Sequence, residues 1–474
     1  MISERISTRA AARAAGPWLI ASLLLAAPAI AWMASSESEH NFLEPFVNPT
    51  GAAQTFSTAG RVDMDNPFFQ NLGTNGRTCF TCHRPDTGWS ITPAGIRERF
   101  EATAGLDPVF RTNDGSNSPN ADVVTVEARR SAYSMLLSKG LIRVGIGIPA
   151  DAEFTLDAVD DPYGFANSHE LSLFRRPLPS TNLALLSTVM FDGRETFPGQ
   201  TIAFDLSDQA NGATMGHAQA SVPLSTEQRE QIVAFETGLF TAQVYDVAAG
   251  DLRSQGARGG PKPLSKQEFY LGINDPLGLN PKGIPFSPVI FTDFAAWARL
   301  QGSHGDDADE EDEGRTAARL AVARGEELFN SKRINITGVK GLNDDLGVAS
   351  IPGTCGTCHD SPNVGNHSMP APLDIGLADA SRRTPDMPLY TLKNKATGQI
   401  VQTTDPGRAL ITGKWKHIGR FKGPILRGLA ARAPYFHNGS AATLADAVRF
   451  YNDRFSIGLT EAEVSDLAAF LRVQ

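Results

Sequence analysis

The sequence of 474 residues contains little cysteine. Its 4 cysteines form two copies of one pattern, Cys79-Phe80-Thr81-Cys82-His83 and Cys355-Gly356-Thr357-Cys358-His359. A C-x-x-C-H pattern is the attachment signature of c-type haem, in which two thiols become thioethers and the histidine binds the iron. With both motifs occupied by haem, no thiol remains for a disulfide bond. The pattern therefore predicts two covalent haems, with His83 and His359 as iron ligands.

Two other chemistries can use the same four cysteines. Two C-x-x-C pairs can share one zinc ion, through four thiolates or a mixture of thiolate and imidazole. They can also form disulfides. Neither alternative requires a histidine at the same place in both copies, and c-type haem is attached outside the cytoplasm, where an export signal would deliver the chain. We favour haem and keep zinc and disulfides as the alternatives.

Long apolar runs are absent apart from one near the N-terminus. Three arginines precede the apolar run from Pro17 to Met33, and Ala29-Ile30-Ala31 offers a small-x-small cleavage site. These features are typical of a secretory signal peptide over residues 1–34, with a retained membrane anchor as the alternative. Because the positive charges precede the apolar segment, either reading places the body of the protein in the periplasm.

The chain also lacks an excess of positive charge, since its formal net charge is −9. This balance argues against a nucleic-acid partner and against binding to an acidic membrane face. It suits a neutral or weakly basic redox partner. An acidic run at residues 306–313 is expected to be part of a solvated linker over residues 301–314, with a docking patch for a basic donor as the alternative.

Helix signals outnumber strand signals. A capping threonine followed by proline predicts a helix over residues 92–104, and a capping box at Ser225 predicts another over residues 225–242. Residues 141–148 and 153–158 are rich in branched side chains and are expected to pair as a short hairpin. The expected fold is therefore mainly α: two cytochrome c-like haem domains with long loops and a minor β-hairpin.

The C-terminal region carries the clearest helix signals. Capping boxes at Thr443 and Thr460 each precede apolar residues at helical spacing. Another helix is expected from about Thr316 to Phe329, ahead of the second motif. A helix before the motif and a terminal helix after it resemble the framework of a cytochrome c domain.

Four short motifs away from the cysteines carry a closer resemblance. They are Asp405-Pro406-Gly407-Arg408, the run from Gly419 to Arg427, Ala433-Pro434-Tyr435-Phe436-His437-Asn438-Gly439-Ser440, and Phe191-Asp192-Gly193-Arg194. Together with the haem motifs they resemble the bacterial di-haem cytochrome c peroxidases. That superfamily includes the MauG-type enzyme, which oxidises tryptophans in a partner protein. The resemblance spans roughly residues 60–474 and is weakest over 120–165.

The resemblance implies a division of labour between the two haems. An N-terminal domain over residues 35–300, with insertions, would hold a peroxidatic haem at His83 that binds hydrogen peroxide. A C-terminal domain over residues 315–474 would hold a haem at His359 that relays or stores an oxidising equivalent. Electrons would come from a small cytochrome c or cupredoxin, or from a protein or organic substrate. A non-enzymatic electron carrier and a di-haem oxygenase are the alternatives to a peroxidase.

One position separates two branches of the superfamily. The sixth ligand of the second haem is methionine in the peroxidases and tyrosine in MauG-like members, and the matching residue here is Tyr451. A phenolate is a hard anionic donor that stabilises ferric iron, so the resemblance implies a low-potential second haem. The alternative is an ordinary core tyrosine. Met369 and Met387 are the competing ligands.

The groups expected opposite His83 depart from the family pattern. Gln200 matches a distal glutamine, but Ala210 stands where relatives have a glutamate. His217 and Asp205 are candidate replacements for that acid or base, with structural roles as the alternative. No histidine lies between His83 and His169, which predicts an iron face open to peroxide.

Three further expectations follow from the resemblance. Phe191 replaces the tryptophan that lies between the haems in relatives, and phenylalanine is much harder to oxidise, so direct tunnelling or a route through Trp89 would have to serve. His437 is expected near the second haem or its propionates, with a structural histidine as the alternative. Relatives bind calcium through backbone oxygens around the residue matching Pro434, so calcium is a further expected ligand.

Overall fold

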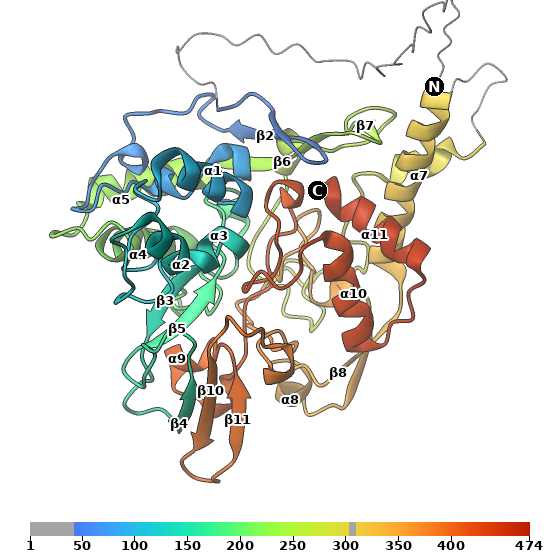
Figure 1. Cartoon of the computed structure of the whole chain (residues 1–474). Coiled ribbons are helices and arrows are strands. Elements are labelled where there is room, and N and C mark those ends of the chain that lie inside the picture. Colours follow the sequence, from blue (N-terminus) through green and yellow to red (C-terminus); the bar gives the residue numbers. More distant parts are fainter. Residues whose placement is uncertain (1–41, 303–309) are drawn as a thin grey trace, which may run out of the picture. The chain divides into compact units, whose positions relative to one another are not determined.

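The computed structural model describes residues 42–302 and 310–474 (Figure 1). The signal peptide expected over residues 1–34 lies outside the described residues, as does part of the expected acidic linker. Within the described ranges, no helix has both the length and the apolar character needed to cross a membrane.

The secondary structure mixes short helices with short strands. The α-helices are α1 (Pro93–Thr103), α2 (Val126–Ala132), α3 (Ser134–Lys139), α4 (Ile202–Gly216), α5 (Thr226–Thr237), α6 (Pro261–Leu264), α7 (Glu310–Ser331), α8 (Asn343–Leu346), α9 (Ala409–Thr412), α10 (Leu444–Phe455) and α11 (Glu461–Arg472). The strands are β1 (Phe46–Asn48), β2 (Gly51–Ser57), β3 (Ile142–Ile146), β4 (Phe154–Asp160), β5 (Leu171–Arg175), β6 (Leu239–Asp246), β7 (Gly250–Asp251), β8 (Ile334–Thr337), β9 (Ser350–Gly353), β10 (Leu389–Asn394) and β11 (Ile400–Thr403).

The strands form small antiparallel sheets with the orders β1-β2-β6-β7, β11-β10-β4, β3-β5 and β8-β9. The expected hairpin is wrong, although both of its segments are strands: β3 pairs with β5, and β4 pairs with β10. Alternating side chains predict a strand but do not choose its partner. Burial of Phe154 with Tyr390 and Leu392 selects β10 here. The structure therefore combines helices with small sheets, and it does not confirm the expected mainly α fold with two haem domains.

The helix starts follow the capping signals in the sequence. The Thr92 hydroxyl accepts a hydrogen bond from the Gly95 N–H at 3.3 Å at the start of α1. Capping boxes open α5, α10 and α11 at Ser225, Thr443 and Thr460. A side-chain oxygen at the cap satisfies a backbone N–H that the helix leaves free, so these starts could be read from the sequence.

The ends of two helices differ from expectation. Helix α5 ends at Thr237 rather than near residue 242, because residues 239–246 form the buried strand β6. Helix α7 begins at Glu310, ahead of the expected Thr316, so the end of the acidic run is helical. Acidic side chains in a first turn are stabilised by the positive end of the helix dipole.

The two halves of the chain share packing. Helices α7 and α11 contact each other (Figure 1) and contribute to a buried cluster whose large members are Phe291, Phe294, Trp297, Phe329 and Phe470. Strand β4 from the first half joins β10 from the second. The proposed domain boundary at residues 301–314 stays a prediction.

Candidate functional site

Both C-x-x-C-H motifs have the same local structure. The Thr78 N–H donates to Thr81 Oγ1 at 3.0 Å, and the Thr354 N–H donates to Thr357 Oγ1 at 3.0 Å. Each motif folds as a 3₁₀ turn, Cys79–Thr81 and Cys355–Thr357. Residues three apart eclipse each other in such a turn, so the two cysteines of each motif face the same side. The threonines in both T-C-x-T-C-H sequences were a visible signal for this geometry that our sequence reasoning did not use.

The two motif histidines make the same kind of hydrogen bond through Nδ1. His83 Nδ1 lies 3.0 Å from the Trp89 carbonyl oxygen, and His359 Nδ1 lies 2.7 Å from the Gly365 carbonyl oxygen. A carbonyl can only accept, so Nδ1 carries the proton and Nε2 keeps a free lone pair for a metal. Burial lowers the pKa of both imidazoles to about 4, which keeps them neutral at physiological pH. This is the arrangement that an axial iron ligand needs.

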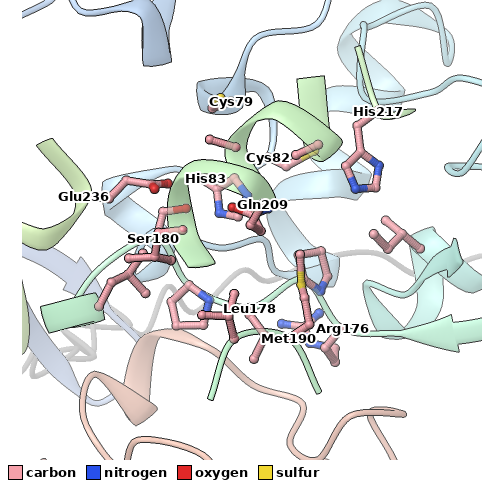
Figure 2. A pocket seen from close by; sticks show the side chains of 18 of the residues that line it. Cys79, Cys82, His83, Arg176, Leu178, Ser180, Met190, Gln209, His217 and Glu236 are labelled. Carbon is pink, nitrogen blue, oxygen red and sulfur yellow. The ribbon is translucent and has the colours of Figure 1, made fainter. Parts of the chain in front are cut away.

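The first motif opens onto a cavity, which we call the first-motif cavity (Figure 2). Its volume is about 1710 Å³, counting the space open to solvent at its mouth. Cys79, Cys82 and His83 line it together with side chains from β3, α4, α5 and the segment after β5. The cavity therefore brings distant segments of the chain to the first motif.

Three cations face this cavity without a carboxylate partner among the described residues: Arg176, Lys422 and Arg432. They donate instead to backbone carbonyls, as Lys422 Nζ does to Thr188 at 3.1 Å. Burial lowers the pKa of Arg176 to about 9, of Lys422 to about 7 and of Arg432 to about 10. A bound group that carries carboxylates would compensate these charges. The two propionates of haem would supply them, so the residues of the cavity fit c-type haem by tether and by charge.

Aromatic rings surround the second motif. The rings of Phe329 and Tyr451 lie 6.1 and 6.4 Å from the ring of His359. Burial raises the pKa of the Tyr451 phenol well above its usual range, and the nearby thiols of Cys358 and Cys355 add to the shift. Tyr451 and the second motif are therefore neighbours in aromatic surroundings.

The motifs that carried the family resemblance meet at one buried arginine. Arg175, at the end of β5, pairs with Asp192 at 2.6 Å and with Asp405 at 2.7 Å. Gly193 follows with φ +67°, and a Cβ there would lie 2.6 Å from the Arg408 guanidinium. Glycine is thus required both for its backbone conformation and for close approach. These residues act structurally: they fix the segment that begins with Phe191.

Phe191 and His437 belong to a row of packed rings. Phe191 lines the first-motif cavity, and its ring lies 6.1 Å from His437, which stacks on Phe421 at 4.0 Å. The ring of Phe436, the residue before His437, lies 6.1 Å from the ring of Tyr451. Both ring nitrogens of His437 are buried without a hydrogen-bond partner, and burial lowers its pKa to about 4. The structure therefore places His437 between the two motif regions, beside Phe191.

The three expected acid–base residues are not brought together. Gln200 is exposed in the turn before α4 and does not line the first-motif cavity. Asp205 is buried, but its carboxylate accepts the Phe197 N–H at 3.2 Å and is absent from the lining. Only His217 lines the cavity, with its Nδ1 bonded to the Asp114 carboxylate. The first two placements favour structural roles.

Sequence reasoning missed two polar residues of the cavity. Gln209 lines it from α4, on the same helical face as Ala213 and His217. Glu236 lines it from α5, where burial raises its pKa to about 7 although the Ser180 hydroxyl opposes the shift. One carboxyl oxygen of Glu236 has no partner, and Figure 2 shows the carboxyl end turned toward the middle of the cavity. The helical spacing of 209, 213 and 217 was a signal in the sequence, whereas nothing local marked Glu236.

Curated proteins similar to this chain share a name. Cytochrome-c peroxidase IdrP1 of Denitromonas iodatirespirans is 32% identical over 133 residues, which cover 25% of this chain and 35% of that protein. Cytochrome c peroxidase Ccp of Escherichia coli K12 is 33% identical over 119 residues, 25% of this chain and 22% of that protein. Cytochrome c551 peroxidase of Nitrosomonas europaea is 31% identical over 119 residues, 25% of this chain and 29% of that protein. Over about a quarter of its length, this chain is similar to proteins named cytochrome c peroxidase.

The relationship to the cytochrome c peroxidases confirms the resemblance seen in the motifs, at modest identity. The chain spans about a third or less of the length of these relatives. No family model matches it. A MauG-like protein associated with microbial copper homeostasis overlaps 92% of this chain and 95% of its own, with a TM-score of 0.35 and 16% identity. A score this low does not establish a shared fold.

Proposed function

We propose that this chain is an exported di-haem c-type peroxidase that reduces hydrogen peroxide in the periplasm with electrons from an external donor. The observation that carries the proposal is the first-motif cavity. It is lined both by the haem-attachment motif and by three cations that have no carboxylate partner among the described residues. The relationship to cytochrome c peroxidases supports the reaction class. The donor class proposed is a small cytochrome c or cupredoxin, or an oxidisable protein or organic substrate.

The chain's own residues can hold the haem at the first site. Cys79 and Cys82 would form the thioethers and His83 Nε2 would bind the iron, while Arg176 and Lys422 would bind the propionates. Bound haem would supply a redox-active iron for the reduction of peroxide. Burial raises the pKa of Cys79 to about 12, so its free thiol is not a reactive thiolate in this pocket.

Peroxide reduction consumes two protons and two electrons for each peroxide and yields two waters, so the site must move protons. Glu236 has a pKa of about 7 and can hold or release a proton near neutral pH. Gln209 offers an amide to orient a bound oxygen, and His217, bonded to Asp114, offers a second proton path from its half-exposed position. We therefore assign the acid–base role to Glu236 in place of the family glutamate that Ala210 replaces.

At the second site we propose that His359 and Tyr451 would bind the iron, with Met369 as the remaining alternative to Tyr451. Met387 packs in a buried cluster with Met135, Leu141 and Phe174. The strongly raised pKa of Tyr451 means that its phenol loses a proton only when a cation compensates the charge. Ferric iron is such a cation. Calcium near Pro434 stays a prediction.

An optical titration of the fully ferric holoprotein with hydrogen peroxide tests the proposal. We expect a shift of the Soret band that is complete at about one equivalent of peroxide, followed by return to the ferric spectrum when a reduced cytochrome c or cupredoxin is added. A non-enzymatic carrier would have two low-spin irons and no reaction. No spectral change in either the ferric or the half-reduced protein would overturn the proposal, and a stable oxygen adduct of the reduced protein would favour the oxygenase.

A further inference from the structure

Three polar side chains that the peroxidase proposal does not use meet beside the second motif. Asp275 comes from the long loop between α6 and the Ala295–Leu300 turn, Asp360 directly follows His359, and His367 lies a few residues further on. One potential ligand atom from each lies within 4.8 Å of the other two. Their exposed fractions are 1%, 0% and 7%. The cluster is therefore shut away from bulk water.

The hydrogen bonds of the cluster leave two atoms without partners. Asp360 accepts from the Ser368 N–H at 2.6 Å and from the Ser368 hydroxyl at 3.0 Å. Asp275 Oδ2 accepts from two backbone N–H groups, at 2.9 and 3.0 Å. Asp275 Oδ1 and His367 Nδ1 are buried with no hydrogen bond, although His367 Nδ1 lies 3.3 Å from Asp360 Oδ2. These bonds fix both carboxylates, while Asp275 Oδ1 has no hydrogen bond from the described residues and His367 Nδ1 has only the Asp360 carboxylate beside it.

Charge gives a second and independent reason to expect a cation. Among the described residues, no lysine or arginine forms an ion pair with Asp275 or Asp360, and His367 is the one basic side chain within ion-pair distance of Asp360. Two carboxylates held this close in a dry interior are costly unless a positive charge lies between them. The loop of Asp275 is also fastened to this region, because the Asn274 side chain donates to the Asp360 carbonyl at 3.0 Å.

We propose that Asp275, Asp360 and His367 bind a divalent first-row transition-metal ion of the zinc or manganese type. Mixed carboxylate and imidazole donors suit such ions, and three protein ligands leave a position for water. Calcium and magnesium prefer oxygen ligands alone, so an imidazole argues against both. The site is distinct from the calcium expected near Pro434, and it does not depend on peroxidase activity.

The metal would tie the loop of Asp275 to the segment that follows the second motif. It would also place a positive charge one residue from His359. A nearby cation stabilises the reduced, less positive iron, so the metal should raise the reduction potential of a haem at that site. Removing the metal should lower both thermal stability and this potential, while the spectrum of the first haem is unchanged.

Metal analysis of the holoprotein tests the proposal. After dialysis against EDTA and addition of Zn²⁺, we expect two haem irons and one zinc per chain, with an increase in melting temperature that Ca²⁺ does not reproduce. Asp275→Asn should lower zinc affinity at least about tenfold. Asp157→Asn, an exposed carboxylate on β4, is the matched control and should retain the zinc.

Two results would overturn the proposal of a metal site. One is the absence of zinc uptake and of any melting shift in the holoprotein, which would mean that the carboxylates share a proton instead. The other is unchanged zinc affinity in both Asp275→Asn and His367→Gln, which would place the zinc elsewhere. If Asp275→Asn fails to fold, the titration of the unaltered holoprotein still decides. Because these readouts are metal content and stability, they are independent of any failure of the peroxide titration.

Discussion

The two motif regions have the same local structure but face different surroundings. Around the first, polar and charged side chains line a large cavity that includes Glu236 and His217. Around the second, the rings of Phe329 and Tyr451 are neighbours of His359. Since the turn and its hydrogen bonds are the same in both, the motif itself cannot give the two motif regions the different roles that we propose. The roles must come from the surroundings.

The residue in the middle of each motif shows how the surroundings differ. A Cβ at Gly356 would lie 2.6 Å from the Ile290 side chain, so the loop carrying Ile290 packs directly on the second motif. Phe80 occupies the equivalent place in the first motif and packs with Phe42 and Phe69. Glycine in one motif and phenylalanine in the other therefore reflect a close backbone approach in one case and an aromatic cluster in the other.

The largest expected effect comes from removing one proposed iron ligand at a time, because this tests directly whether the two motif regions have different roles. In His83→Ala we expect complete loss of the wild-type rapid reaction with peroxide, because the iron that binds peroxide loses its proximal ligand while Cys79 and Cys82 keep the haem attached. In His359→Ala the first peroxide equivalent should still react, but the oxidising equivalent should not be shared. Stopped-flow absorbance measures both, with His169→Ala, an exposed histidine, as control.

Equal loss of the peroxide reaction in His83→Ala and His359→Ala, with both haems present by iron analysis, would contradict the division of labour. It would mean that peroxide reacts only through a coupled pair of haems, or that the second site is the reactive one. The comparison of the two motif regions would then rest on structure alone.

Replacing Glu236 should give the next largest effect. Glu236→Gln keeps the shape but cannot accept a proton, so we expect the rate of peroxide reaction to fall by about 10²–10⁴-fold. In the unaltered protein the rate should rise as pH increases through about 7, where the Glu236 carboxyl becomes a base. The variant should lose this dependence. Glu227→Gln, an exposed glutamate on the same helix, is the control.

The pH dependence of protein stability is a second test of Glu236, and its direction follows from the raised pKa. Burial raises its folded-state pKa from 4.5 to about 7, so between these values the folded protein holds a proton that the unfolded chain releases. This contribution to stability is full below about pH 4.5 and is lost as pH increases through 7. Glu236→Gln should therefore be more stable than the unaltered protein above pH 7. If the rate of the peroxide reaction is unchanged in Glu236→Gln, the acid–base role would pass to His217.

Local signals in the sequence predicted local structure well. The caps at Thr92, Ser225, Thr443 and Thr460 mark helix starts because a side chain and a backbone N–H a few residues away decide them. The 3₁₀ turn of each C-x-x-C-H motif is local in the same way, because it depends on a threonine three residues from the backbone N–H that it accepts from. The partner of β4 could not be read, because burial against residues more than two hundred positions away selects β10.

For a similar reason, the sequence did not identify the polar groups that reach the first-motif cavity from distant segments. Glu236 and Lys422 reach the cavity from distant segments, and their role comes from burial that only the fold creates. The family pattern pointed instead to Gln200, which the structure places at the surface. Matching residues by their position along the chain fails where a shift of one helical turn moves a side chain away from the site.

Changing Tyr451 should sharpen the comparison through the second haem, with the smallest effect on the peroxide rate once that haem is reduced. Tyr451→Met replaces a hard anionic donor by a thioether, which favours ferrous iron. We expect the potential of the second haem to increase by a few tenths of a volt, within the range of about 0.8 V that axial ligands cover. Peroxide should still react at the first haem, but only after the second is reduced. Spectroelectrochemistry measures the potential, with Tyr163→Phe as control.

An unchanged second-haem spectrum and potential in Tyr451→Met would make Tyr451 a packing residue. Its ring also lies 5.3 Å from Phe450 and 6.4 Å from Phe455, so a purely structural role is physically reasonable. The variants then separate the two roles by chemistry. Tyr451→Phe preserves the ring contacts and removes only the oxygen, so a ligand role requires that it also alter the second haem. A packing role requires that Tyr451→Phe leave the second haem unchanged while Tyr451→Met lowers the melting temperature.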